Sequence, residues 1–527
     1  MGVVLLGAAV LGAVGCGRER APTNVLLVTL DTLRADHVGY VGGAKAATPN
    51  LDALAARGVA FRDVQALVPI TLPSHASILF GIPPHELQHY NNGQILPPLK
   101  GAVPAAELFK ARGYATAAFV SLGVLEKRYG LARGFDIYED AFPKDRWYLD
   151  AAEVNARALP WLERVRGGKF FGWIHYSDPH DPYAPPDTPD DTVLKLNGEM
   201  VGRLCLAKYP TAEVDLDLRA GENTLVWTIR NDSPESAQAY LARFDRLEFS
   251  PAPDAGFRTT FGPEWEIRAA DGVYFAKDNA GISIRSDARR RVRLSVRGRP
   301  IWSLEYIRKM YRREVEYLDR ELGRLWAKLT ELGLWDTTAV VVAGDHGEGL
   351  GEFVNAFGEA HVGHIHYLYS YYVRVPLIVV DPRAERRGIL RDDPATLLDI
   401  APTLAALAGF ESPRQFQGRN LLGRSAPATR DILTATYKPE AIYDKFALRR
   451  SPWHLILTPQ ENKIEVYDLR TDPEEIRNLF GGTEMPEDAR PLLPLLETRT
   501  REILMGKTEV KIDKGAEDML RALGYIK

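Results

Sequence analysis

Two nearly uninterrupted apolar runs, Asn24–Leu30 and Thr338–Gly344, constrain the fold of this chain more than any other feature. A run without an alternating polar face is typical of a strand that is covered on both sides, as in a parallel sheet with helices on both faces. Each run ends directly at an aspartate, Asp31 in the first and Asp345 in the second. Because parallel strands bring their carboxyl ends to one edge of a sheet, we expect the two carboxylates to lie together there.

Helical and extended segments alternate around these two runs, and their alternation predicts the fold class. The expected helices and strands together indicate a doubly wound α/β fold with a mostly parallel central sheet. Helices are expected over residues 48–57, 104–112, 151–164, 304–332 and 395–408, and further strands over 114–121, 169–175 and 375–380.

Two regions depart from this alternation and predict the domain organisation. Residues 191–300 contain few helical stretches, carry the hairpin-type pair Asn197-Gly198 and alternate apolar with polar side chains, so we interpret them as a β-rich insertion, a small sandwich. Residues 426–527 read as short strands and a terminal helix, a small α+β subdomain. The catalytic α/β domain is therefore expected over residues 24–190 and 300–425.

The N-terminus carries an apolar run of signal-peptide length in residues 1–16, which ends at Cys16. It resembles a bacterial lipoprotein signal, so we expect export and anchoring to the membrane of the periplasm or cell envelope by a lipid on Cys16. A plain cleaved signal and a buried N-terminal strand are the alternatives. If Cys16 is lipidated, Cys205 has no cysteine left for a disulfide, because the chain has two cysteines.

The overall charge gives no basis for nucleic-acid binding. Lys and Arg number 66 and Asp and Glu number 70, which leaves a formal net charge of -4. A nucleic-acid-binding domain is typically strongly basic.

The stretch Thr71-Leu-Pro-Ser-His75 follows a proline-containing loop and predicts a helix that begins at or just after Thr71. Unpaired backbone N–H groups and the positive end of the helix dipole would favour an anion beside the Thr71 hydroxyl. The alternative is an ordinary helix start with a threonine on the surface.

Four side chains are predicted to share one divalent ion. Asp31 and the pair Asp345-His346 end two buried strands, and Thr71 lies at a helix start. A metal there would lower the pKa of the hydroxyl and hold substrate oxygens. Carboxylate and hydroxyl oxygens suit Ca²⁺, Mg²⁺ or Mn²⁺, whereas an imidazole favours Mn²⁺ or Zn²⁺.

Several stretches resemble the sulfatase family of the alkaline phosphatase superfamily. The resemblance covers roughly residues 24–190 and 300–527 and leaves the insertion out. The matching stretches are Val28-Thr-Leu-Asp-Thr-Leu-Arg-Ala-Asp-His37, Thr48-Pro-Asn-Leu-Asp-Ala-Leu-Ala55, Thr71-Leu-Pro-Ser-His-Ala-Ser77, His175-Tyr-Ser-Asp-Pro-His180, Gly344-Asp-His-Gly-Glu-Gly-Leu350, Arg374-Val-Pro-Leu-Ile378, Tyr467-Asp-Leu-Arg-Thr-Asp-Pro473 and Leu520-Arg-Ala-Leu-Gly-Tyr525.

The resemblance implies an alkaline phosphatase-like α/β sandwich with a smaller C-terminal sheet domain. It also implies that Asp31, Thr71, Asp345 and His346 are the metal ligands. Thr71 occupies the nucleophile position of the family, and His75 occupies the position of a nearby arginine.

Three further residues match substrate-contacting positions of the family or its relatives. His180 and His364 match histidines that contact the ester or protonate its leaving group, and Asn92 matches an asparagine that holds the anion in related phosphodiesterases. A buried structural histidine is the alternative for His180, and a turn residue is the alternative for Asn92. For His364 the neighbours His361 and His366 leave the register open.

Two departures from the family pattern bear on the substrate. Sulfatases carry Cys or Ser at the position of Thr71, which is converted to formylglycine, and threonine cannot form that aldehyde, so no formylglycine is expected. Thr32 also stands where a second aspartate often follows the first ligand. Asp, Thr, Asp and His at one metal instead resemble phosphodiesterases and phosphoryl transferases of the superfamily.

These observations predict a metal-dependent hydrolase of sulfate or phosphate esters that uses Thr71 as nucleophile, acting on an anionic ester such as that of a glycan. One alternative is an envelope transferase that passes a phosphoryl-linked headgroup to an acceptor. The other is a catalytically silent homologue that binds a glycan through the insertion.

One strand-like segment of the insertion is rich in arginine. In residues 291–297 the apolar side chains alternate with Arg291, Arg293 and Arg297, which places the arginines on one face of a strand. This face is either a solvated outer surface or a docking surface for a polyanionic glycan or the membrane.

Overall fold

The structure is a computed structural model that describes most of the chain from residue 24 onward. The predicted signal segment with Cys16 and the terminal motif beyond Leu520 lie outside the described residues. The described residues are 24–507, except 44, 100, 145, 187–191, 207–210, 230–241, 255, 269–271, 302, 355–357, 424–428, 438–442 and 482–483, together with 516, 519 and 520.

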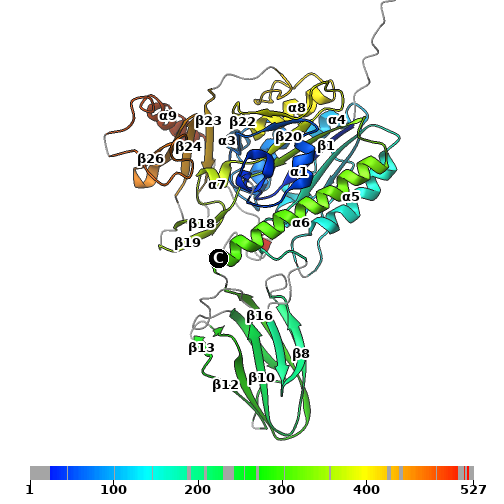
Figure 1. Cartoon of the computed structure of the whole chain (residues 1–527), viewed down its shortest axis with the longest axis vertical. Helices are drawn as coiled ribbons and strands as arrows, with labels where there is room; N and C mark the ends of the chain where they lie inside the picture. The colour runs from blue at the N-terminus through cyan, green and yellow to red at the C-terminus, as the bar shows by residue number, and fades with distance from the viewer. Residues whose placement is uncertain are drawn as a thin grey trace, which may run out of the picture.

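An eight-stranded sheet forms the centre of the molecule, in the order β21-β2-β20-β17-β1-β6-β4-β5 (Figure 1). Strand β20 runs antiparallel to β17 and β2, and the other pairs in this sheet are parallel. The prediction of a mostly parallel sheet is confirmed. In sheet order, the strands are Ile389–Arg391, Val59–Phe61, Leu377–Val380, Thr338–Gly344, Asn24–Leu30, Phe170–Tyr176, Ala115–Phe119 and Ile137–Glu139.

Helices cover both faces of this sheet, which explains why the two longest apolar runs lack a polar face. In β1, Val25 and Leu27 pack into one apolar core, whereas Leu26, Val28 and Leu30 pack into the other. The first core is closed by α2 (Thr71–Phe80), α4 (Ala105–Lys110) and α8 (Ile400–Leu407), and the second by α1 (Pro49–Ala55), α5 (Ala151–Val165) and α6 (Leu304–Glu331).

The expected helix over residues 395–408 is wrong at its N-terminal end. Residues Ala395–Thr396 form the short strand β22, which pairs in parallel with β3 (Val64–Gln65), and α8 begins only at Ile400. The Asp399 side chain accepts the Thr396 N–H at 2.9 Å, which stabilises a 3-10 turn between strand and helix. A local side-chain bond of this kind competes with the helix and delays its start.

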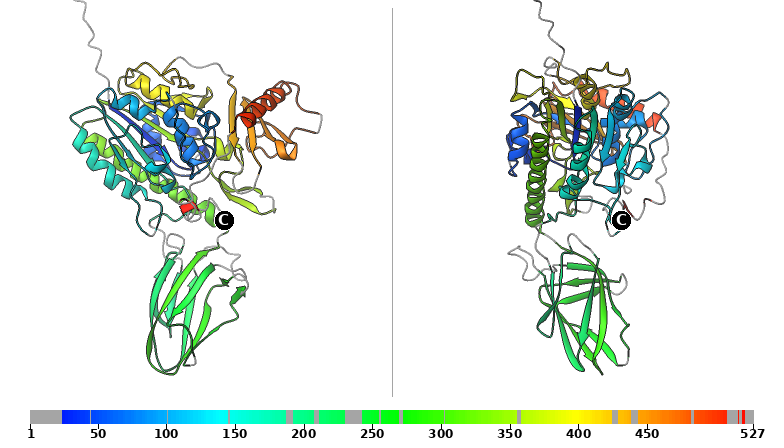
Figure 2. Two further views of the ribbon diagram at one scale, coloured as in Figure 1. Left: turned by 180° about the vertical axis from the view of Figure 1, so that it is seen from behind. Right: turned by 90° about the vertical axis from the view of Figure 1, so that its right-hand side faces the viewer.

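The insertion folds into two five-stranded antiparallel sheets that lie below the sheet-and-helix body in the views of Figures 1 and 2. Aromatic rings fill the core between them, with Trp227 edge-on to Phe244 at 5.1 Å. One sheet has the order β12-β15-β10-β7-β8 (Phe257–Phe261, Ala280–Ser286, Gly221–Ile229, Thr192–Leu196, Glu199–Leu204), and the other β13-β14-β11-β16-β9 (Trp265–Arg268, Val273–Ala276, Ala242–Ser250, Arg290–Pro300, Thr211–Leu218).

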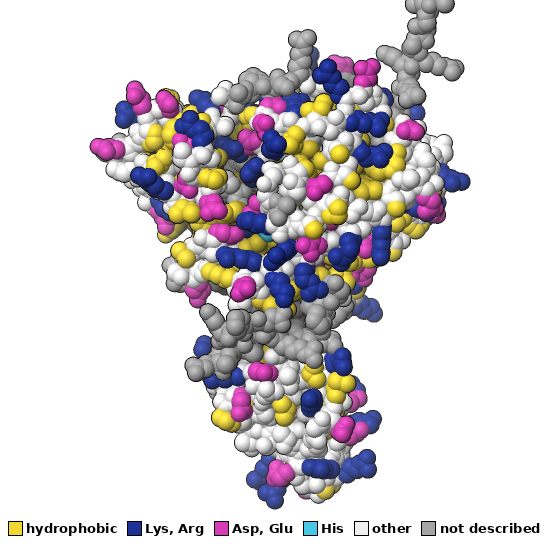
Figure 3. Space-filling view, in the orientation of Figure 1, with side chains coloured by type: hydrophobic (Ala, Val, Ile, Leu, Met, Phe, Trp, Pro, Cys, Tyr) yellow, Lys and Arg dark blue, Asp and Glu magenta, His cyan; other side chains and the backbone are white. Residues whose placement is uncertain are grey.

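Two arginines of β16, Arg291 and Arg293, are paired with acids of the neighbouring strand β9. Arg291 lies opposite Asp217 and binds it at 2.7 Å, and Arg293 lies opposite Asp215 and binds it at 2.9 Å. Figure 3 shows acidic and basic side chains interspersed over the visible face of the insertion. This pairing favours the solvated outer face over the polyanion-docking face.

A further antiparallel sheet lies in the C-terminal part, in the order β23-β24-β25-β26, with helix α9 (Leu492–Gly506) packed against it. Among the described residues, none of the helices has both the length and the apolar character that a bilayer crossing requires. The four strands are Ile432–Thr436, Lys445–Arg450, Trp453–Thr458 and Lys463–Asp468.

Candidate active site

The two aspartates that end the longest apolar strands lie side by side, as the sequence predicts. In the parallel pair of β1 and β17, Leu30 is opposite Gly344, so Asp31 and Asp345 leave the same sheet edge together. His346 follows directly. One ligand atom from each of the three side chains lies within 4.8 Å of the others, and all three residues are fully buried.

Each carboxylate has one oxygen that the protein holds and one that it leaves bare. Asp345 Oδ1 accepts the backbone N–H of Thr32 at 3.1 Å and of His346 at 2.7 Å, and Asp31 Oδ2 lies 3.2 Å from Nε2 of His175. Within the described part of the chain, Asp345 Oδ2 and Asp31 Oδ1 are buried without a hydrogen-bond partner.

The imidazole of His346 supplies a third ligand atom to the same place. Its Nδ1–H donates to the carbonyl oxygen of Gly347 at 3.0 Å, so Nε2 carries the lone pair. This Nε2 lies 3.4 Å from Asp345 Oδ2 and 3.9 Å from Asp31 Oδ1. Two orphaned carboxylate oxygens and a nitrogen lone pair that converge in this way fit a divalent cation.

The electrostatics of the cluster also favour a cation. Burial and the neighbouring Asp31 charge raise the pKa of Asp345 well above its usual range. Burial acts in the same direction on Asp31, but the hydrogen bond with His175 and the nearby His346 outweigh it and lower the pKa of Asp31. Two carboxylates without an intervening positive charge oppose each other's ionisation. A bound cation removes this electrostatic repulsion.

Thr32 shapes the turn after Asp31 through an unusual backbone conformation. Its φ of 55° lies in the left-handed region, which is costly for a β-branched residue. The conformation directs the Thr32 N–H at Asp345, and the Tyr311 hydroxyl of α6 holds the Thr32 carbonyl at 2.7 Å. Position 32 thus orients the second carboxylate through its backbone.

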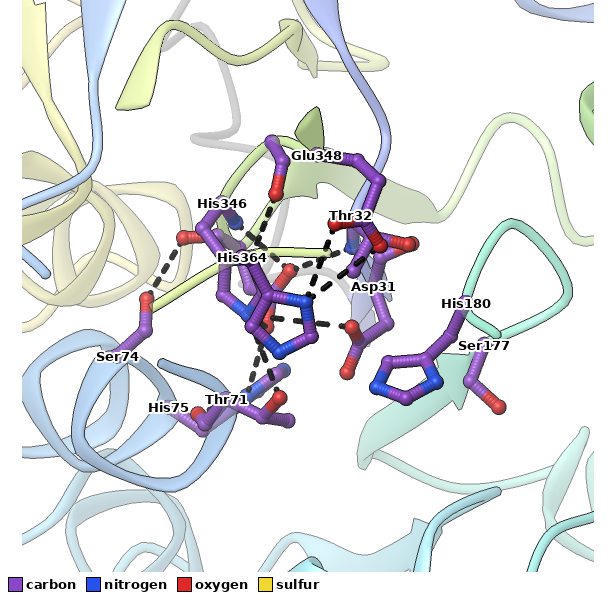
Figure 4. Close-up of polar contacts among 12 residues, drawn as sticks. Asp31, Thr32, Thr71, Ser74, His75, Ser177, His180, His346, Glu348 and His364 are labelled. Carbon is purple, nitrogen blue, oxygen red and sulfur yellow. Dashed lines mark hydrogen bonds and ion pairs between the residues drawn. The ribbon is translucent and has the colours of Figure 1, made fainter. Parts of the chain in front are cut away.

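Thr71 is the first residue of α2, as predicted, and it is fully buried at the cluster rather than on the surface. Its Oγ1 lies 3.3 Å from Nε2 of His346 (Figure 4). Asn92 lies beside it, because its Oδ1 accepts the N–H of Leu72 at 2.9 Å. The amide nitrogen of Asn92 is buried and has no partner among the described residues.

His75 uses both ring nitrogens within the protein. Nδ1–H donates to the carbonyl oxygen of Thr71 at 2.8 Å, and Nε2 lies 3.0 Å from the hydroxyl of Thr29. Burial, reinforced by the neighbouring His175, lowers the pKa of His75 to about 3, so the ring is neutral. The structure therefore places His75 as a brace for the first turn of α2.

The two histidines predicted to contact the ester lie together at the cluster (Figure 4). The ring centroids of His180 and His364 are 5.1 Å apart, and His364 is 4.5 Å from His346. His361 instead bonds the Tyr372 hydroxyl at 3.0 Å. His364 is thus the member of the histidine-rich segment that reaches the site.

Three buried side chains at the site were not singled out from the sequence. His175 and Ser121 form a chain that leads to Asp31, and the carboxylate of Glu348 lies 3.4 Å from Nδ1 of His364. Burial raises the pKa of Glu348 well above its usual range, which favours its neutral form. Two of them could have been identified from their positions in the sequence. His175 is the second-last residue of β6, and Glu348 follows His346 by two residues.

Known proteins are similar to this sequence over long stretches. The Sulfatase family model matches residues 23–410, and a model of the N-sulphoglucosamine sulphohydrolase C-terminal region matches residues 358–501. The chain is 22% identical to the N-acetylglucosamine-6-O-sulfatase of Bacteroides thetaiotaomicron, over 95% of this chain and 90% of that protein.

Two solved structures share the fold at low identity. One is a protein in complex with its substrate D-glucosamine-2-N,6-O-disulfate, with a TM-score of 0.63, 18% identity and coverage of 93% of this chain and 100% of that one. The other is the phosphonate monoester hydrolase of Agrobacterium radiobacter, with a TM-score of 0.59, 17% identity and coverage of 92% and 96%.

Proposed function

Because the chain belongs to the sulfatase family of the alkaline phosphatase superfamily, we propose that it is a metal-dependent hydrolase of sulfate or phosphate esters with Thr71 as its nucleophile. The observation that carries the proposal is the convergence of two bare carboxylate oxygens and one imidazole nitrogen beside the Thr71 hydroxyl. These atoms are Asp31 Oδ1, Asp345 Oδ2 and His346 Nε2.

The protein side chains divide the reaction between them. A divalent ion bound by Asp31, Asp345, His346 and Thr71 would lower the pKa of the threonine hydroxyl and neutralise charge on the ester oxygens. Thr71 Oγ1 gives up its proton to solvent and attacks the sulfur or phosphorus atom, while the bond to the leaving oxygen breaks. Water then hydrolyses the resulting threonine ester.

Other side chains near Thr71 bind the substrate oxygens, supply a proton or hold the helix start. The amide N–H of Asn92, which has no partner among the described residues, and the positive end of the α2 dipole bind the non-bridging oxygens, where negative charge gathers during the displacement. His180 or His364 supplies the proton that the leaving oxygen takes up. His75, with both nitrogens engaged, holds the carbonyl of Thr71 rather than the substrate.

The identity of residue 71 supports activity on phosphate esters as well as sulfate esters. Formylglycine is made from Cys or Ser, and position 71 is Thr. An alcohol nucleophile at one metal suits phosphoryl transfer, so we expect phosphoester turnover at least comparable with sulfatase turnover. Sulfated sugars named for the relatives support an anionic glycan ester as the natural substrate.

Replacing Thr71 with Ala tests the proposal. The variant should lose turnover of every ester by more than about 10³-fold, because the attacking oxygen is gone. The loss of one buried hydroxyl should lower the unfolding free energy by only about 1 kcal/mol. The matched control is Ser77→Ala, which removes another buried hydroxyl from α2, and it should keep wild-type turnover.

Turnover and metal content are measured on both folded variants. Ester turnover by Thr71→Ala at the wild-type rate would refute the assignment of the nucleophile.

A further inference from the structure

A chain of buried hydrogen bonds runs from Asp31 across three neighbouring strands. In the parallel pair of β1 and β6, Thr29 lies opposite His175, so the His175 ring stands beside the residue that follows β1. Its Nε2 lies 3.2 Å from Asp31 Oδ2. Its Nδ1 faces Ser121, which follows β4, with the backbone nitrogen at 3.3 Å and Oγ at 2.8 Å.

The partners of the His175 ring determine which nitrogen carries the proton. The Ser121 backbone N–H is a donor only, so Nδ1 must accept from it. Ser121 Oγ in turn lies 2.8 Å from Ser177 Oγ, which closes the chain within the protein. A neutral His175 therefore carries its proton on Nε2 and donates it to Asp31 Oδ2.

This donation selects which oxygen of Asp31 remains bare. With Oδ2 bound to His175, only Oδ1 is left without a partner in the described residues, and Oδ1 is the oxygen on the side of His346. Asp31, His175 and Ser121 are all fully buried, so water does not compete for these bonds.

We propose that His175 is a positioning residue for the metal centre, which fixes the carboxylate of Asp31 through the chain Asp31–His175–Ser121. The inference rests on the proposed function only in assuming that the cluster binds a divalent ion. Hydrogen-bond partners of metal-binding carboxylates raise metal affinity by orienting the ligand, typically by 10–100-fold.

Metal affinity of the metal-stripped full chain tests the proposal without any substrate. Isothermal titration with Mn²⁺ and, separately, with Zn²⁺ is performed on wild type, His175→Met and His175→Gln. We expect His175→Met to bind 10–100-fold more weakly, whereas His175→Gln, whose amide N–H can still donate to Asp31, should recover part of the affinity.

His89→Gln is the matched control, because His89 is another fully buried histidine that donates to a carbonyl, that of Gln94 at 2.9 Å. It should bind both ions with wild-type affinity. A folded His175→Met variant with wild-type affinity would overturn the inference and leave the proposed function standing. Absence of binding by wild type would overturn both.

The tautomer of His175 gives a second measurement that needs no substitution. Nitrogen-15 NMR of histidine-labelled wild-type protein should show His175 neutral, with its proton on Nε2 and none on Nδ1. A proton on Nδ1 would contradict the chain, even if both His175 variants failed to fold.

Discussion

Thr71 shows how a residue's meaning depends on its surroundings. A threonine at a helix start is usually an ordinary cap, yet here it is fully buried at 3.3 Å from a histidine lone pair. Thr32 is comparable, because its left-handed backbone spends conformational energy to direct an N–H at Asp345. Residues of the site thus adopt conformations and environments that are unfavourable one by one, and a bound cation would compensate for their free-energy cost.

His89 predicts a measurable pH dependence of stability. Burial lowers the pKa of His89 to about 4 in the folded protein, against 6.5 for an exposed histidine. Between these two values the unfolded chain takes up a proton that the folded chain does not, so stability falls as the pH drops from about 6.5 to about 4. The contribution of His89 is roughly 3 kcal/mol, at 1.36 kcal/mol per pKa unit.

Urea denaturation midpoints of wild type and His89→Gln, measured in steps between pH 7 and pH 4, check this prediction. The variant should lose less stability on acidification than wild type, although His75 and other buried histidines still contribute. Identical pH profiles for the two proteins would show that the pKa of His89 is the same in the folded and the unfolded protein, which would contradict the prediction.

At the scale of elements, apolar pattern predicted the strands that carry the ligands, because a strand buried on both faces excludes polar residues. The apolar pattern could not predict the direction of a strand. A strand was expected over residues 375–380, but nothing in its sequence indicated that β20 runs antiparallel to β17. The pattern also could not predict His175, whose importance comes from the neighbouring positions of β1, β6 and β4 in the sheet rather than from its own strand.

The arginines of β16 lead to a prediction about the insertion. Because Arg291 and Arg293 are paired with Asp217 and Asp215, replacing both arginines with serine should leave turnover of a polymeric anionic substrate within about twofold of wild type at low salt. Turnover of a small aryl ester, measured in parallel, should be equally unchanged. A selective loss on the polymer would instead identify this face as a docking surface.

For the whole molecule, the sequence predicted a mostly parallel α/β body, a β-rich insertion and a small C-terminal sheet. The three parts could be told apart because apolar side chains recur at different spacings in each. The insertion leaves the body after β6 and returns at α6. Both elements supply residues at the site, since His175 lies near the end of β6 and Tyr311 of α6 holds the Thr32 carbonyl. Anchoring to a membrane by a lipid on Cys16, which lies outside the described residues, remains a proposal.

In the proposed function, a metal bound by Asp31, Asp345 and His346 supports attack of Thr71 on an ester. The most direct measurement compares an aryl sulfate, a phosphate monoester and a phosphate diester with metal-stripped protein and with protein reloaded with Mn²⁺, Zn²⁺, Mg²⁺ or Ca²⁺. We predict no turnover without metal and, in the reloaded protein, a kcat/KM on a phosphoester at least equal to that on the sulfate. Equal turnover by stripped and reloaded protein would contradict the metal-dependent mechanism, and sulfate turnover with no phosphoester turnover would contradict the role given to Thr71.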